Sequence, residues 1–173
     1  VVVSNPPYLQ SSKMGETIKS YVRANYTGKY DLYEAFIERC LSFTNSEGYS
    51  ATITPANFMY LYYSRKMRKK LLKKSNFVEA LHLSDRDEAY MNVASVITPL
   101  TGNLVDSRFS RVVEADNKPE ASRSIVNNLR KKNHDKRTYV FSQKRIDDIG
   151  RQPFLYWFGE ETLKLFSNYS SID

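Results

Sequence analysis

The chain begins with VVVSNPPYLQ (residues 1–10), in which a run of valines leads directly into two adjacent prolines. Consecutive β-branched residues favour a buried strand. Neither Pro6 nor Pro7 has an N–H group with which to continue a strand ladder, so the strand must end in a stiff loop. Ligands of open α/β sheets bind at the carboxyl ends of the strands. We therefore expect a ligand-binding loop from Asn5 to Tyr8.

The groups in this loop suit an amine that donates two hydrogen bonds. The carboxamide oxygen of Asn5 is one acceptor, and the carbonyl of Pro6, held by restricted torsions, is a second. Tyr8 offers a flat face on which a base can stack. The exocyclic amine of adenine is one such group, and it is a poor nucleophile. Accepting both of its hydrogens favours a more pyramidal nitrogen. The rate of its attack on an electrophile would then depend on positioning and electrostatics. A purely structural interpretation stays open, with a proline stop after a core strand and Asn5 capping a turn.

Further along, strand and helix patterns alternate. Strands are predicted at residues 1–3, 49–54, 77–83 and 94–100, and helices at 31–43 and 57–74, with Asn57 as the N-cap of the second helix and a polar loop before the first. This alternation is typical of a parallel sheet covered by helices. The link between the third and fourth strands is short and has no helical period, so it predicts a hairpin and one antiparallel strand.

Beyond residue 102 the pattern is weaker. We predict strands at 109–113 and 138–141 and helices at 120–132 and 160–166. A chain of 173 residues with 41% apolar composition can bury one core, so a single domain or a piece of one is expected.

Charge and composition restrict the possible partners and sites. The chain has 26 Lys and Arg against 19 Asp and Glu, which favours a polyanionic partner such as nucleic acid or an acidic membrane surface, and charge alone does not choose between them. No apolar run reaches the roughly 20 residues that span a bilayer, and no leader is visible, so a soluble cytoplasmic protein without membrane contact is expected. The single cysteine, Cys40, falls on the apolar face of a predicted helix and is expected in the core. His82 and His134 are far apart, so no metal site is expected.

The motif and its surroundings resemble a known family. Asn5-Pro6-Pro7-Tyr8 resembles the Asn/Asp/Ser-Pro-Pro-Tyr/Phe motif of S-adenosylmethionine-dependent amino-methyltransferases, in particular DNA adenine N6 enzymes. YDLYEAFIERCLSF (30–43) and EGYSATITPANFMYLYYSRKMRKKLL (47–72) resemble the segments that follow this motif in large single-chain adenine methyltransferases of restriction and phage defence. PFLYWFGEETLKLF (153–166) is similar to a segment of the PglX-type methyltransferases of BREX phage defence, which more often have Pro-Gly where this chain has Gly150-Arg151.

The resemblance implies a fold, a donor and a division of the chain. The fold is a partial Rossmann-like class I S-adenosylmethionine-dependent methyltransferase, a mixed sheet with helices on both faces and an α+β extension. Residues 1–102 would form the carboxyl-side half of the catalytic domain and 103–173 an extension leading to target recognition. The glycine-rich cofactor loop is expected upstream of Val1, so the fragment alone is expected to be inactive. S-adenosylmethionine is the expected cofactor of the intact protein, without a metal.

The resemblance also implies site residues and partners. The implied catalytic residues are Asn5, Pro6, Pro7 and Tyr8. Asn5 and Pro6 would receive the amine of a flipped adenine, and Tyr8, with Tyr90 from the 84–93 loop as a second candidate, would stack on the base. The expected partners are double-stranded DNA and other phage-defence subunits, and the exposed sheet edge favours self-association. The candidate DNA contacts are the second basic run: Arg130, Lys131, Lys132, Lys136 and Arg137.

Two alternatives and one further basic run stay open. The same motif also fits methyl transfer to a protein glutamine or to RNA, and the basic charge fits a non-catalytic nucleic-acid binding module. The first basic run, between Arg65 and Lys74, is interpreted as the solvated face of a helix rather than a DNA contact.

Overall fold

The computed structural model describes residues 1–84 and 92–168 and contains one mixed sheet of six strands in the order β1-β2-β4-β3-β5-β6. The strands are β1 (Val2–Ser4), β2 (Ser50–Pro55), β3 (Ser75–His82), β4 (Asn92–Pro99), β5 (Asp106–Arg111) and β6 (Thr138–Ser142). Each predicted strand is present, although β5 begins and ends earlier than predicted. The prediction that the first strand is buried is wrong, because β1 is an edge strand in which Val3 is 78% exposed. The predicted hairpin is confirmed, because β3 and β4 pair antiparallel.

Strand direction brings distant parts of the chain to one edge of the sheet. β1 is parallel to β2, β4 is antiparallel to both β2 and β3, and β5 is parallel to β3. Strands β1, β2, β3 and β5 therefore end at the same edge, which we name the strand-end edge. Because β6 is antiparallel to β5, its first residue also lies there. The strand-end edge thus collects Ser4, Pro55, His82, Arg111 and Thr138.

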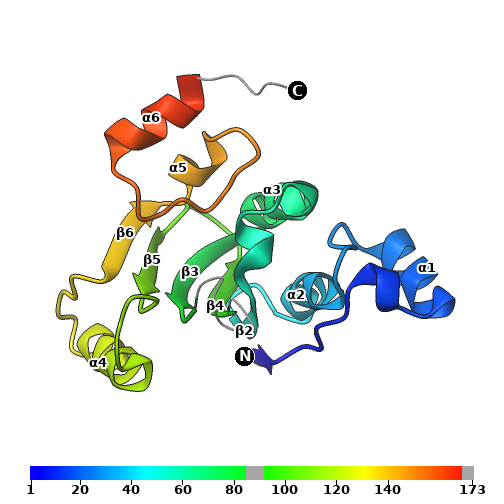
Figure 1. The fold of residues 1–173 in the computed structure, drawn as a ribbon, viewed down its shortest axis with the longest axis horizontal. Helices are drawn as coiled ribbons and strands as arrows, with labels where there is room; N and C mark the ends of the chain where they lie inside the picture. The colour runs from blue at the N-terminus through cyan, green and yellow to red at the C-terminus, as the bar shows by residue number, and fades with distance from the viewer. Residues whose placement is uncertain (85–91, 169–173) are drawn as a thin grey trace.

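Helices cover both faces of this sheet (Figure 1). The α-helices of the described residues are α1 (Glu16–Asn25), α2 (Leu32–Ser42), α3 (Arg65–Lys74), α4 (Lys118–Arg130), α5 (Lys144–Asp147) and α6 (Glu160–Asn168). α2 and α3 pack on the first face, where Ile37 and Leu71 join the main core with Phe77. α4 packs on the second face, where Ile125 contacts a smaller cluster that includes Leu81. The predicted fold of a mixed sheet with helices on both faces is therefore confirmed.

The prediction of one continuous helix over residues 57–74 is wrong. After β2 the chain forms a short 3₁₀ helix, η2 (Ala56–Met59), becomes extended at Leu61, and forms a second, η3 (Tyr62–Ser64), before α3 begins. Asn57 is not an N-cap, since η2 starts one residue earlier. The break has a physical reason: the buried Arg68 side chain donates to the carbonyls of Phe58 and Leu61, which a continuous helix would use in its own ladder.

Helix α1 lies within the segment predicted as a polar loop. Of its residues only Val22 is buried, while Ile18 and Tyr21 are exposed. Figure 1 shows α1 beyond α2, away from the sheet. Because this helix contributes so little to the core, its apolar pattern is faint in the sequence.

The second half of the chain continues the same sheet and core. Phe109, Phe141, Phe154 and Tyr156 belong to the main core cluster together with Phe77. The proposed boundary at residue 102 falls between β4 and β5 and remains a prediction. Within the described residues, no helix is both long and apolar enough to cross a membrane.

Candidate active site at the strand ends

The Asn5–Tyr8 loop leaves the carboxyl end of β1 at the strand-end edge. Asn5 and Pro7 are exposed, Pro6 is buried and Tyr8 is half-buried. The Tyr8 hydroxyl lies 3.3 Å from Asn5 Oδ1 and 3.3 Å from the carbonyl oxygen of Ile53 in β2. It has one hydrogen to donate, so it serves one of these oxygens at a time. The sequence motif therefore folds into a tight loop in which the tyrosine is turned back toward the asparagine.

Tyr8 is held in this position by the first face of the sheet. Its ring meets Tyr33 of α2 edge-on, with centroids 6.0 Å apart, and packs against the main core. Burial raises the pKa of the Tyr8 hydroxyl, so it remains a donor at neutral pH. One side of the loop is thus fixed before any ligand binds.

The far end of the loop is fastened to the start of α2. The Leu9 N–H donates to Asp31 Oδ1 at 2.9 Å, and the Leu32 N–H donates to the Leu9 carbonyl at 2.9 Å. Burial raises the pKa of the Asp31 carboxyl, while the Leu9 N–H opposes that effect. Asp31 therefore acts on the loop by positioning its backbone.

The loop presents two acceptors of different kinds. Asn5 Oδ1 is on an exposed side chain, and its recorded contact is the 3.3 Å approach of the Tyr8 hydroxyl. The Pro6 carbonyl receives no hydrogen bond from the described residues. An NH₂ group has the two hydrogens that a pair of acceptors requires. This arrangement suits an amine better than a hydroxyl, which has only one hydrogen to donate.

A buried carboxyl, that of Glu34, lies in α2 behind this loop. Its side chain is fully buried and accepts a short hydrogen bond from the Ser64 hydroxyl. The Tyr30 N–H lies 3.5 Å from its other oxygen. A Cβ at Gly28 would be 2.6 Å from Glu34 Cβ, so the backbone at Gly28 packs closely against the base of this side chain. Burial raises the pKa of Glu34 to about 7, with the negative charges of Asp31 and Glu38 acting in the same direction.

Glu34→Gln is expected to change how stability depends on pH. The folded pKa of about 7 lies above the ordinary value of 4.5, so the folded state binds more protons than the unfolded state between these values. Glu34 therefore lowers stability as pH rises from about 5 to 8, by about 2 kcal/mol. Relative to the native chain, Glu34→Gln should gain that amount over this range, as measured by urea unfolding at several pH values. Parallel stability curves for the two proteins would contradict the assignment.

Aromatic residues that the sequence did not single out gather further along the strand-end edge. The His82 ring stacks on Tyr60, with centroids 6.2 Å apart, and its Nδ1 lies 3.0 Å from the Tyr156 hydroxyl. Tyr60 meets Trp157 edge-on, and the Arg111 guanidinium lies 5.2 Å from the Trp157 ring centroid. Trp157 is half-buried against the main core. Tyr90, the second stacking candidate, lies outside the described residues.

Four of the five predicted DNA contacts are exposed side chains, and the fifth is paired with a carboxylate. Arg130, Lys131, Lys132 and Lys136 are exposed. Arg137 instead forms a two-bond ion pair with Asp135, at 2.8 and 2.7 Å, which holds the pKa of that carboxyl well below its usual range. The Arg111 N–H donates to the Arg137 carbonyl, which places the start of β6 beside the end of β5. Lys136 therefore lies at the strand-end edge, and it forms no ion pair with a carboxylate of residues 1–84 or 92–168.

The first basic run is only partly a solvated face. Lys66, Lys69, Lys73 and Lys74 are exposed, as expected. Lys70 forms an ion pair with Glu38, and Arg68 is 1% exposed. Cys40 is buried in α2, as predicted.

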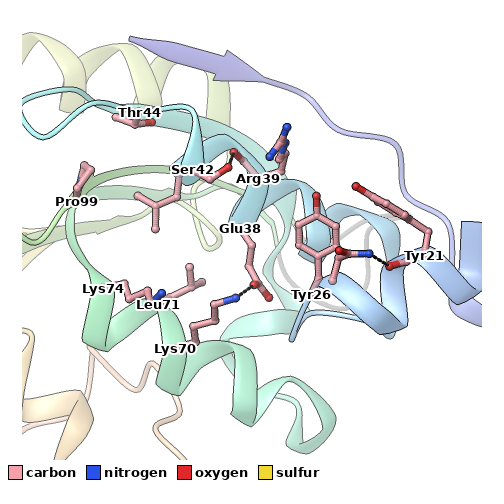
Figure 2. A pocket seen from close by; sticks show the side chains of 12 residues that line it. Tyr21, Tyr26, Glu38, Arg39, Ser42, Thr44, Lys70, Leu71, Lys74 and Pro99 are labelled. Carbon is pink, nitrogen blue, oxygen red and sulfur yellow. Dashed lines mark hydrogen bonds and ion pairs between the residues drawn. The ribbon is translucent and has the colours of Figure 1, made fainter.

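Two hollows differ in their relation to the motif. An apolar groove of about 380 Å³ on the second face reaches Asn5 and is lined by side chains that include Val3, Ile53, Val96 and Leu129. A second groove, of about 480 Å³, lies between α1, α2 and α3, where the Glu38–Lys70 pair projects into it (Figure 2). Because Ser42, Lys74 and Pro99 line that second groove, it opens at the sheet edge opposite the strand-end edge. Within the described residues, no group of three or more His, Cys, Asp or Glu side chains is placed to hold a metal ion.

Comparison with known proteins finds methyltransferases at the level of both sequence and structure. The sequence pattern that defines the Eco57I restriction-modification methylases matches residues 1–89. The adenine-specific methyltransferase PglX of Lacticaseibacillus casei (strain Zhang) is 26% identical, over 99% of this chain and 15% of that protein. This chain thus spans about one seventh of its curated relative.

Solved structures share the fold. The type I restriction-modification methyltransferase subunit from Streptococcus thermophilus superposes with a TM-score of 0.64, at 16% identity, over 88% of this chain and 36% of that one. A protein from Listeria monocytogenes assigned to the class I S-adenosylmethionine-dependent methyltransferases gives a TM-score of 0.55, at 13% identity, over 74% of this chain and 41% of that one. The sheet and its helices therefore share the fold of part of a class I methyltransferase.

Proposed function

Because this chain belongs to the family of Eco57I restriction-modification methylases, we propose that it is the carboxyl-side part of the catalytic domain of a DNA adenine N6-methyltransferase acting in restriction or phage defence. The observation that carries the proposal is the pair of acceptors at the end of β1, Asn5 Oδ1 and the Pro6 carbonyl, beside a fixed tyrosine. The relation to an adenine-specific methyltransferase supports adenine as the target base.

In the proposed reaction the loop receives the amine of an adenine that has left the duplex. Asn5 Oδ1 and the Pro6 carbonyl each accept one N–H bond, which orients the nitrogen lone pair away from both oxygens and toward the methyl donor. The acceptors also stabilise the positive charge that grows on the nitrogen during attack, so no strong base is needed in the first step. Tyr8 supplies an aromatic face in place of the lost base stacking. Its edge contact with Tyr33 keeps that face in position.

S-adenosylmethionine is the proposed donor, and when bound it supplies an electrophilic methyl group on a sulfonium sulfur. Its methionine end requires a glycine-rich turn after a strand. Among the described glycines none has a positive φ angle, and none forms such a turn after β1, β2 or β3. The described residues therefore fit the site that binds the target amine, but not the site that binds the methionine end of S-adenosylmethionine. The intact protein is proposed to supply that cradle from outside this chain.

Duplex DNA is the proposed macromolecular partner, and the net charge of +7 supports a polyanion. Arg130, Lys131, Lys132 and Lys136 are proposed phosphate contacts, with Arg137 the weakest candidate because Asp135 compensates it. Other defence subunits are also proposed as partners. β1 is an edge strand with Val3 78% exposed, which supports the proposal that the isolated chain self-associates.

Transfer of labelled methyl from S-adenosylmethionine tests this function. The intact methyltransferase that contains this chain is expected to label duplex DNA, and the modified base is expected to be N6-methyladenine; the isolated chain is expected to give no transfer. Label in protein glutamine or in RNA, with none in DNA, would replace the substrate while keeping the chemistry. DNA binding without any methyl transfer would favour a non-catalytic binding module.

A further inference from the structure

An exposed tyrosine, Tyr62, begins η3 and lies between two arginines. The guanidinium carbon of Arg65 lies 3.7 Å from the centroid of the Tyr62 ring, and that of Arg151 lies 4.8 Å from the same centroid. Arg65 Nη1 also donates to the Tyr62 carbonyl at 3.2 Å. The ring remains 53% exposed. We refer to Arg65, Tyr62 and Arg151 as the arginine–tyrosine stack.

The backbone at Arg151 is held in a conformation that normally favours glycine. Arg151 has a φ angle of 67°, and the next residue, Gln152, has 49°. A side chain in this left-handed region costs free energy, and such residues persist where the surroundings hold them in place. Here the buried Arg68 holds the turn, since its Nη2 and Nε donate to the Arg151 carbonyl at 2.8 and 3.3 Å. Glycine would fit this turn without strain, so what Arg151 adds is its guanidinium.

The stack is continuous with the loop that carries Asn5. Tyr63, next to Tyr62, packs on Tyr30 with ring centroids 5.0 Å apart. Tyr30 precedes Asp31, the residue that receives the Leu9 N–H. Through these contacts the stack borders the far end of the candidate active-site loop, on the side of the first face.

The charges of the stack are not compensated. Within the described residues, neither Arg65 nor Arg151 forms an ion pair with a carboxylate. Lys66 and Lys69, on the neighbouring turn of α3, are also exposed. Arg65 uses one Nη1–H on the Tyr62 carbonyl, and the other N–H donors of the two guanidinium groups have the planar geometry that matches phosphate oxygens. Stacking on the ring also reduces the side-chain freedom that binding would otherwise remove.

We propose that the arginine–tyrosine stack binds the sugar-phosphate backbone of the DNA that presents its base to Asn5. This inference rests on the proposed function for the identity of the nucleic acid. A phosphate here would neutralise two adjacent positive charges and fix the register of the duplex relative to the loop. The basic net charge of the chain favours DNA over a protein partner.

Arg151→Gly in the intact methyltransferase tests the proposal, because glycine removes the guanidinium and also relieves the left-handed backbone. Binding to a fluorescent duplex is measured by anisotropy over a series of salt concentrations. We expect affinity to fall roughly tenfold near 0.1 M salt, and the slope of log K against log salt to decrease by about one. The thermal midpoint should not fall. Lys164→Ala, which removes one exposed charge on α6 outside the stack, should leave affinity and slope unchanged.

A second pair of variants tests the ring itself. Tyr62→Phe keeps the stacking surface and should bind DNA as the native protein does, whereas Tyr62→Leu removes it and should weaken binding in the same direction as Arg151→Gly.

The outcomes separate this inference from the proposed function. If the Arg151→Gly variant methylates DNA and binds it with the affinity and salt slope of the native protein, the proposal that the stack binds DNA is wrong. The proposed function is then unaffected. If the native protein binds DNA without methylating it, and Arg151→Gly reduces the salt slope of that binding, the proposed role of the stack is supported. The proposed function is then wrong. If Arg151→Gly loses binding to an acidic partner subunit and keeps its affinity for DNA, the surface is a protein contact and the proposal is wrong.

Discussion

Asn5→Ala in the intact methyltransferase is expected to lower the rate of methyl transfer by about 10²-fold or more while leaving the affinity for duplex DNA unchanged. The alanine removes one of the two acceptors at the end of β1 and keeps the prolines that define the loop. Loss of one preorganised hydrogen bond to developing charge costs about 10²- to 10³-fold in comparable sites. Because Asn5 is exposed and its recorded contact is the 3.3 Å approach of Tyr8, its removal should change stability by less than about 0.5 kcal/mol.

Two companion variants make the Asn5 result specific. Asn127→Ala removes an exposed carboxamide from α4, far from the loop in sequence, and should leave transfer unchanged. Asn5→Asp keeps an acceptor oxygen at the same place and should retain more activity than the alanine variant. Initial rates of labelled methyl transfer at saturating DNA, together with anisotropy binding curves, give both readouts. Equal rates for Asn5→Ala and the native protein would remove Asn5 from the mechanism.

The parts of this fold that were predictable are those in which neighbouring residues in sequence decide the structure. The valines and prolines of residues 1–10 define a strand and its end, because the ring of proline removes the donor whatever surrounds it. Tyr33, Ile37 and Cys40 recur at helical spacing, and all three are buried in α2. The short, aperiodic link after β3 required a hairpin. The candidate loop was found for the same reason: its chemistry lies within four consecutive residues.

The parts that were not predictable depend on contacts between distant residues. Arg68 lies in a basic run whose pattern predicts a solvated helix face. It is buried instead, because carbonyl groups from two separate segments accept hydrogen bonds from it. The same convergence breaks the helix that the apolar spacing predicts. The arginine–tyrosine stack joins Tyr62 to Arg151, and no local pattern links them. The Arg137–Asp135 ion pair is the exception, because the two residues are two positions apart and the aspartate was visible in the basic run.

Arg68→Met is expected to lower the free energy of unfolding by about 3–5 kcal/mol. The Arg68 side chain is 1% exposed and donates to three carbonyls, those of Phe58, Leu61 and Arg151. Burial lowers the pKa of this guanidinium to about 10, so it stays charged at neutral pH and its bonds are charge-assisted. Methionine fills a similar length but has no donor, and each carbonyl left unpaired in a buried place costs about 1–3 kcal/mol. Urea unfolding of the chain at neutral pH measures the loss.

Lys69→Met provides the matched control, since the next residue along α3 is exposed and should change stability by less than about 0.5 kcal/mol. Arg68→Lys should recover only part of the loss, because a single ammonium lacks the planar fork that reaches carbonyls of separate segments. If Arg68→Met were within 1 kcal/mol of the native chain, the guanidinium would not be what holds these segments together. The same side chain fixes the left-handed turn at Arg151. Its loss should therefore also free the Arg151 guanidinium from its position over the Tyr62 ring. Arg68→Met protein that is still folded should therefore bind DNA with a lower salt slope, which connects a buried cation to the proposed DNA surface.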